Sequence, residues 1–148
     1  MKLPLFIAAT VLGSTLAHHA CALDFKSVGG APAIMYDAPS EKGRRVYVAP
    51  RGMPVEVVVT YGEWSKVRDA AGTLSWIQSK AITPKRMLVV SAANARIFTA
   101  ADEGSPVVFT ADKNVLLDMI ESPNNGWVKV RHRDGQSGFA KVGDVWGD

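Results

Sequence analysis

Apolar and polar positions alternate over short stretches of residues 24–148, and clusters of Gly, Pro, Asn and Asp separate one stretch from the next. Alternation with a period of two places successive side chains on opposite faces, which is typical of a β-strand. No long window after the N-terminal leader carries apolar residues at helical spacing. Many short strands with Gly and Pro turns between them predict an all-β fold, either a small barrel or a sandwich. The predicted strands are 33–36, 45–49, 55–60, 64–68 and 74–78, then 88–91, 95–99, 107–110, 115–120, 126–131 and 138–141.

One stretch of this pattern occurs twice. Residues 64–77 and 127–140 share the pattern W-x-K-V-R-x-x-x-G-x-x-x-[W/F]-[I/A] at an offset of 63, with five identities and one aromatic exchange. Weaker matches continue upstream at an offset of 62, for example Met35-Tyr36 with Ile97-Phe98. The sequence therefore indicates an internal duplication of a unit of about sixty residues. A unit of that size buries only about 60% of its surface, so we expect the two copies to pack against each other.

The alternation inside the repeat predicts which side chains face outward. In each copy the valine between the two basic residues is apolar and is expected in the core, which leaves Trp, Lys and Arg on the opposite face. The Gly that follows is expected in the turn of a hairpin. The outward residues are Trp64, Lys66 and Arg68 in the first copy and Trp127, Lys129 and Arg131 in the second.

The N-terminal residues have the features of a signal peptide. A basic Met1-Lys2 start precedes an apolar run, and Ala20-Cys21-Ala22 fits the small-residue cleavage pattern. We predict a signal peptide of residues 1–22, cleaved after Ala22, and a periplasmic or secreted protein. The apolar run is shorter than the roughly 20 residues of a membrane-spanning helix, so no stable membrane insertion is expected after cleavage. Lipidation of Cys21 is an alternative, although His18 stands where a lipoprotein signal has an apolar residue.

Charge and residue types narrow the function classes. Residues 23–85 hold nine Lys and Arg and six Asp and Glu, a net charge of +3, whereas residues 86–148 hold seven and eight, a net charge of −1. Neither value indicates a nucleic-acid partner. The only Cys lies in the leader, and His132 is the only His outside it. No zinc site, cofactor motif or nucleophile–base pair follows from such a set, so we predict a protein that is not an enzyme and has no cofactor.

The order of strands and turns, with W-x-K-V, the Gly turn and then [G/S]-[W/F]-[I/A], resembles the bacterial SH3-like domains. The segments Arg51–Val90 and Gly138–Gly147 carry the resemblance most closely. The resemblance implies two tandem small SH3-like barrels of about five strands each, which we place at residues 23–84 and 85–148. It also implies a binding scaffold, because members of this family are often associated with cell-wall peptides or peptidoglycan.

Several residues are candidates for a ligand-binding surface. An exposed Trp beside cations can stack on a sugar or a peptide while the cations hold a carboxylate. The alternative is that Trp64 and Trp127 cover a barrel edge or the interface between the barrels. Tyr residues suit a wet groove, and only the first unit has them, which makes it the favoured binding unit. The candidate ligand-binding residues are Trp64, Lys66, Arg68, Tyr36, Tyr47 and Tyr61, with Trp127, Lys129 and Arg131 as the second copy.

Two functions follow as hypotheses. The first is a secreted non-catalytic binding module for a cell-envelope ligand, with peptidoglycan peptide or glycan as the partner. The second is an adaptor or regulator that binds a periplasmic protein partner.

Overall fold

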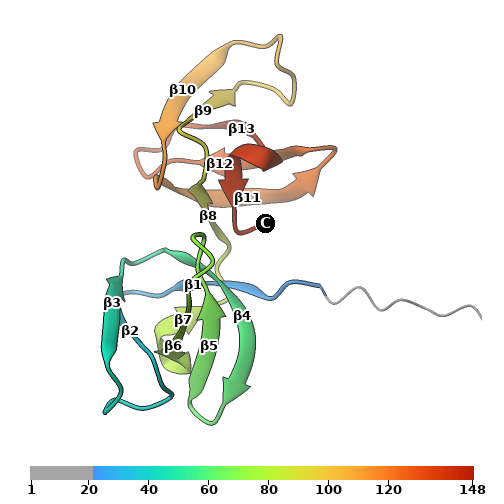
Figure 1. Ribbon diagram of the computed structural model, residues 1–148. Coiled ribbons are helices and arrows are strands. Elements are labelled where there is room, and N and C mark those ends of the chain that lie inside the picture. Colours follow the sequence, from blue (N-terminus) through green and yellow to red (C-terminus); the bar gives the residue numbers. More distant parts are fainter. Residues whose placement is uncertain (1–21) are drawn as a thin grey trace, which may run out of the picture.

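The chain folds into two β-barrels, one above the other, joined by a short connection (Figure 1). The computed structural model describes residues 22–148. Residues 1–21, which include Cys21 and most of the predicted signal peptide, lie outside the described part. The first sheet comprises β1 (Phe25–Val28), β2 (Ala33–Tyr36), β3 (Arg45–Ala49), β4 (Pro54–Tyr61), β5 (Trp64–Arg68), β6 (Leu74–Gln78) and β7 (Ile82–Thr83). The second sheet comprises β8 (Met87–Val90), β9 (Asn94–Phe98), β10 (Val107–Asp112), β11 (Leu116–Asn124), β12 (Trp127–Arg131), β13 (Ser137–Lys141) and β14 (Val145–Trp146).

The two sheets have the same topology. Their strand orders are β3-β2-β6-β5-β4-β1-β7 and β10-β9-β13-β12-β11-β8-β14, so each strand of the second barrel corresponds to the strand seven places earlier. The all-β class and the duplicated barrel predicted from the sequence are confirmed. Each sheet has seven strands where about five were expected. Three strands escaped prediction: β1, with four residues, and β7 and β14, which have two residues each and are too short to show an alternating pattern.

Two other local features differ from the sequence-based expectation. Each barrel contains one three-residue 3₁₀ turn, η1 (Ser79–Ala81) and η2 (Val142–Asp144). Strand β11 continues through Pro123 to Asn124, a segment expected to be a turn, and the pairing shifts register between Glu121 and Asn124. A proline is tolerated there because the ladder is already irregular at that point.

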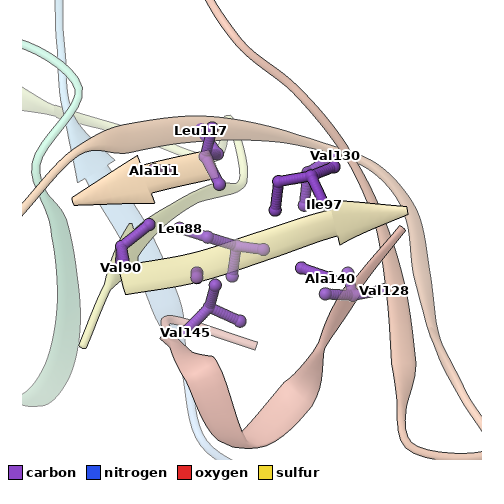
Figure 2. Packing of buried hydrophobic residues seen from close by; sticks show 10 residues of the cluster. Leu88, Val90, Ile97, Ala111, Leu117, Val128, Val130, Ala140 and Val145 are labelled. Carbon is purple, nitrogen blue, oxygen red and sulfur yellow. The ribbon is translucent and has the colours of Figure 1, made fainter. Parts of the chain in front are cut away.

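Each barrel has its own apolar core, built from the inward positions of the alternating strands. The second core draws side chains from all seven of its strands, and Figure 2 shows them meeting between the strands. The packing is tight at Gly138, where a Cβ atom would lie 2.5 Å from the carbonyl oxygen of Phe98. The corresponding residue of the first barrel is Ser75, which is buried. The repeated turn glycines, Gly72 and Gly135, have positive φ angles of 85° and 95°, which explains why both copies keep glycine.

The barrels pack against each other through both ends of the described chain. The rings of Phe25 in β1 and Trp146 in β14 meet edge to face with centroids 5.0 Å apart. The guanidinium of Arg86 lies 5.6 Å from the centre of the Phe25 ring. Its Nη2 donates a hydrogen bond of 2.8 Å to the carbonyl of Gly147. Through Phe25 the first barrel thus packs on Trp146 and Arg86 of the second unit, as expected for two small units that pack against each other.

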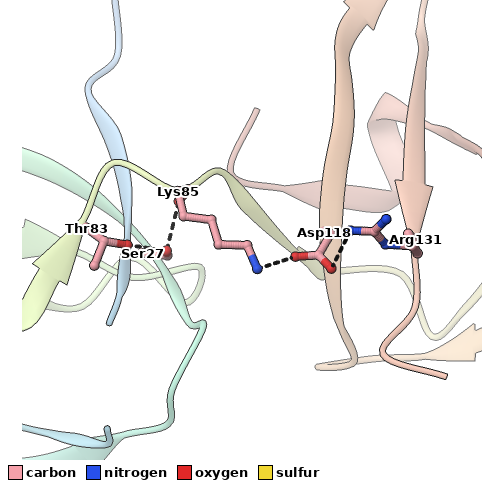
Figure 3. A network of polar contacts seen from close by, with 5 residues as sticks. All are labelled: Ser27, Thr83, Lys85, Asp118 and Arg131. Atoms are coloured by element: carbon pink, nitrogen blue, oxygen red, sulfur yellow. Dashed lines mark hydrogen bonds and ion pairs between the residues drawn. The ribbon is translucent and has the colours of Figure 1, made fainter. Parts of the chain in front are cut away.

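Polar contacts continue this interface along the linker. The hydroxyl of Ser27 in β1 donates to the carbonyl of Lys85 at 2.8 Å, and the Lys85 ammonium lies 2.7 Å from the Asp118 carboxylate in β11 (Figure 3). The linker thus has contacts on both sides, one to each barrel.

Candidate functional site

The outward face of β5 carries the residues predicted from the repeat. Ser65 and Val67 are buried, while Trp64, Lys66 and Arg68 are only partly buried. The predicted assignment of faces is therefore confirmed in the first barrel. Trp76 in β6 is also only partly buried, and the neighbouring Ile77 is buried.

In the first barrel, side chains from four strands form one row that we call the aromatic face. The Trp64 ring packs edge to face against Tyr36 with centroids 5.3 Å apart. Tyr36 pairs with Trp76 across the β2–β6 contact, and the Lys66 ammonium lies 5.9 Å from the centre of the Trp76 ring. Tyr61 pairs with Trp64 and is 69% exposed. The aromatic face of the first barrel therefore comprises Tyr61, Trp64, Lys66 and Trp76 at its surface, with Tyr36 beneath them. Tyr36 is only 7% exposed, so it packs behind Trp64 and offers almost no surface to a ligand, unlike the accessible residue that was predicted.

The second barrel repeats this arrangement, with phenylalanines in place of Tyr36 and Trp76. The Trp127 ring packs edge to face on Phe98 with centroids 5.5 Å apart. The Lys129 ammonium lies 5.9 Å from the centre of the Phe139 ring, the same distance as in the first copy. In both copies the repeated tryptophan packs on an aromatic residue of its own barrel, so neither takes its main contact from the interface between barrels.

The two copies differ in the charge beside the repeated lysine. Lys129 forms an ion pair with Glu121 in β11, with Nζ and Oε1 3.0 Å apart. The residue of the first barrel that pairs with Lys66 across the same strands is Val59, which is 47% exposed. Within residues 22–148, Lys66 has no carboxylate in ion-pair contact. The first barrel thus presents an uncompensated lysine beside aromatic rings, whereas in the second barrel Glu121 neutralises the corresponding lysine.

The two repeated arginines each lie beside an acidic side chain of β4 or β11. Arg68 forms an ion pair of 2.8 Å with Glu56 on the neighbouring strand. Arg131 lies 3.7 Å from Asp118, the corresponding acidic residue, and lines the cleft between the barrels. The structure therefore groups Trp64 with Lys66 and leaves Arg68 occupied by its own carboxylate.

The structure does not bring Tyr47 to the aromatic face. Its ring packs against the core of the first barrel, and its hydroxyl donates a hydrogen bond of 2.8 Å to Asp69. Burial, together with the Asp69 carboxylate, raises the pKa of Tyr47. Asp69 also accepts hydrogen bonds from the backbone of Ala71 and Thr73. Tyr47 therefore holds the turn between β5 and β6, a role that its position in an alternating strand did not reveal.

Hollows lie beside the aromatic rings of both barrels. Trp127 borders two of them, of about 630 and 430 Å³, and their walls include the carboxylates of Asp102, Glu103 and Glu121. A hollow of about 310 Å³ in the first barrel is lined by Tyr36, among others. The larger hollow beside Trp127 is acidic, because the carboxylates of Asp102, Glu103 and Asp144 outnumber Lys141, whereas in the smaller one Glu121 is paired with Lys129.

The comparison with protein families identifies the fold. The model of the bacterial SH3 domain matches residues 29–84 and 91–147. The chain belongs to the bacterial SH3 domain family. Both matched stretches are SH3 domains, which confirms the resemblance seen in the sequence, and neither match is to a catalytic domain.

Solved structures give more distant likenesses. NlpC2 from Trichomonas vaginalis has 12% sequence identity and a TM-score of 0.38, with 85% of this chain and 48% of that chain covered. An NlpC/P60 family protein from Bacillus cereus has 16% identity and a TM-score of 0.37, with 82% and 55% covered. The chain thus spans about half the length of these structures. A comparison with curated proteins gave no match.

Within residues 22–148, no cluster of three His, Cys, Asp or Glu side chains is arranged to hold a metal ion. His132 lies 3.1 Å from Asp134 in the turn between β12 and β13. A hydrogen bond from the backbone of Gln136 lowers the pKa of Asp134, and His132 adds to the effect. The same part of the chain contains no helix of the length and apolarity that a membrane span needs.

The residues that form the contact between the two SH3 barrels were not identified from the sequence. Phe25, Arg86 and Trp146 form the aromatic and cationic contact between them. One signal was present, because Trp146 breaks the duplication: at an offset of 63 its counterpart in the first copy is Thr83. A large aromatic residue in one copy alone is a candidate for a contact that only one copy makes.

Proposed function

We propose that this tandem SH3 protein is a non-catalytic binding module of the cell envelope that recognises peptidoglycan, through its stem peptide or its glycan, on the aromatic face of the first barrel. The observation that carries the proposal is the uncompensated ammonium of Lys66 on the same face as the partly exposed rings of Trp64 and Trp76. Stacking of a ring on a sugar or peptide, combined with a cation for a carboxylate, suits a ligand that offers both.

The difference between the two copies supports the first barrel as the binding unit. Lys129 is already neutralised by Glu121, so a ligand carboxylate gains less there. The first barrel also has the exposed Tyr61 and the higher positive charge, +3 for residues 23–85. The second barrel then serves as the degenerate copy, with Trp127, Lys129 and Arg131 contributing weakly.

The proposed location follows from the leader. Cleavage after Ala22 releases a chain of residues 23–148 into the periplasm or the medium, where peptidoglycan is accessible. The membership of a family often associated with cell-wall peptides agrees with that location.

Co-sedimentation with purified sacculi tests the proposal. The mature chain is expected to bind saturably, and Lys66→Gln is expected to weaken binding about fivefold, in line with the loss of a charged hydrogen bond at a partly exposed site. Lys129→Gln is the matched control and is expected to change binding less than twofold, because its charge is already paired. Trp64→Ala is expected to remove binding, with the melting temperature measured alongside because Trp64 packs on Tyr36.

The outcomes separate the possibilities clearly. Equal effects of Lys66→Gln and Lys129→Gln would contradict the assignment to the first barrel. Absence of binding to sacculi at low salt would contradict peptidoglycan as the ligand. Binding that disappears entirely as salt rises would indicate a general charge attraction and not a site.

A second function is favoured by one specific observation. Strand β4 exposes Val58, Val59 and Tyr61 in sequence, with exposed fractions of 45%, 47% and 69%. In the second barrel the residues at the Val59 and Tyr61 positions of the strand pairing are polar, Glu121 and Asn124. Exposed apolar surface of this kind favours a protein partner, so an adaptor that binds a periplasmic protein is the alternative. Cross-linking in the periplasm would capture that partner, and Val59→Glu would abolish the cross-link.

A further inference from the structure

A second surface, distinct from the aromatic face, lies where the two barrels meet. A cleft of about 960 Å³ is formed there by five segments from different parts of the chain. They are the end of β1 with the turn after it, the turn between β3 and β4, the linker with the start of β8, the start of β11, and the end of β12 with the turn after it. A cleft of this size is within the range of small-molecule sites.

The cleft is strongly cationic. Arg51, Lys85, Arg131 and Arg133 line it, and Asp118 is the single carboxylate in its lining. Residues 23–148 as a whole carry sixteen basic and fourteen acidic side chains. The concentration of four cations around one carboxylate therefore departs from the near balance of the chain.

Asp118 shows how the cleft holds an anionic group. Its carboxylate lies 2.7 Å from the Lys85 ammonium and 3.7 Å from the Arg131 guanidinium, so the linker and the second barrel converge on it (Figure 3). Arg51 and Arg133 have no such partner: among residues 22–148, neither makes an ion pair or a side-chain hydrogen bond to the protein. One belongs to each barrel, and both border the same space.

Part of the remaining lining of the cleft is apolar. Met87, Val115 and Leu116 contribute partly buried apolar surface, beside the polar side chains of Ser27, Thr83 and Asn114. The edge-to-face contact of Phe25 with Trp146 joins the barrels on either side of the cleft. Low-dielectric walls strengthen the attraction of fixed cations for an anion between them.

We propose that the cleft between the barrels is a binding site for a ligand with at least two anionic groups, phosphate or carboxylate, which Arg51 of the first barrel and Arg133 of the second hold from opposite sides. Guanidinium groups suit both kinds of anion because they donate two parallel hydrogen bonds. Lys85 and Arg131, held by Asp118, add positive charge behind them. The ligand thereby connects the two barrels, a role that neither barrel fulfils alone.

Isothermal titration of the mature chain with pyrophosphate and, separately, with the tricarboxylate tricarballylate tests the site. Arg51→Gln and Arg133→Gln are each expected to weaken binding about five- to tenfold, the loss of one charge-assisted contact at an exposed position. Arg45→Gln is the control, since Arg45 is an exposed arginine of the first barrel that does not line the cleft. It removes the same charge and is expected to change binding less than twofold.

The two probes and the control make each outcome decisive. Tighter binding of pyrophosphate identifies a phosphate source, and tighter binding of tricarballylate identifies a carboxylate source. No measurable binding of either probe at low salt overturns the proposal, as does an equal loss in Arg45→Gln and Arg51→Gln. Sacculus binding that depends on Lys66 is a separate readout, so failure of one site leaves the other standing.

Discussion

The contact between Phe25 and Trp146 offers a direct test of whether the two barrels stabilise each other. The rings meet edge to face with centroids 5.0 Å apart and planes at 86°, and Phe25 is only 7% exposed. Such a pair contributes about 0.5–1.5 kcal/mol beyond the apolar area that it buries. We therefore expect a coupling free energy of about 1 kcal/mol between the two side chains.

A double-mutant cycle with Phe25→Ala, Trp146→Ala and the double variant isolates this coupling. Each single variant also loses buried apolar surface, about 3–4 kcal/mol for the buried Phe25 and less for the partly exposed Trp146. Phe25→Ala also removes the cation–π contact with Arg86. The single Phe25→Ala variant and the double variant both lose this contact, so its free energy cancels from the coupling.

Urea unfolding followed by far-UV circular dichroism measures the four free energies of unfolding without relying on tryptophan fluorescence. The double variant is expected to be more stable, by about 1 kcal/mol, than the sum of the single effects predicts. A coupling within about 0.3 kcal/mol of zero, the limit for independent sites, would refute the claim that this contact stabilises the interface. Separate unfolding transitions of the two barrels in the wild-type chain would refute it as well.

The other predictions concern packing, pH and the aromatic face. Gly138→Ala is expected to destabilise the protein by about 2–3 kcal/mol in urea unfolding, because the new methyl group meets a backbone carbonyl at 2.5 Å. Ser75→Ala at the corresponding position is expected to change stability by less than about 1 kcal/mol, and equal effects would contradict the packing argument. Because folding raises the pKa of Tyr47, its contribution to stability is complete below the unfolded tyrosine pKa of about 10 and is lost as the pH rises above that value. Tyr47→Phe is therefore expected to lose less stability than wild type between pH 9 and pH 11, by about 0.5–1 kcal/mol after screening; parallel profiles would contradict this. Val59→Glu gives Lys66 the neighbour that Lys129 has, so it is expected to weaken sacculus binding with an unchanged melting temperature, and unchanged binding would show that the free lysine is unimportant.

Much of the fold could be read from local sequence. The period-two alternation of W-S-K-V-R placed Trp64 and Lys66 outward and Val67 inward, and the structure agrees. That prediction succeeds because the direction of successive side chains is fixed by the geometry of the strand itself. The repeated sequence pattern also predicted the duplicated barrel correctly. Each copy folds from its own residues into the same order of strands.

The candidate site could be predicted only in part. Sequence grouped Trp64, Lys66 and the first-barrel tyrosines, but Tyr36 is only 7% exposed and Tyr47 packs on the core and the Asp69 turn. Tyr47 and Asp69 are 22 residues apart, and nothing in the alternation of β3 indicates that their side chains meet. Strands β7 and β14 were missed because two residues show no period, and their pairing depends on partners far along the chain.

The sequence alone determined the all-β class, the duplication, the outward placement of the repeated Trp and Lys, and the family that these features resemble. These properties depend on backbone geometry and on neighbours within a few residues. Only the tertiary structure decided that Lys129 is neutralised while Lys66 is free, that Trp146 and Phe25 join the barrels, and that Arg51 and Arg133 border one cleft. Those features depend on which residues come within a few ångströms after folding, because ion pairing and ring packing act only over such short distances.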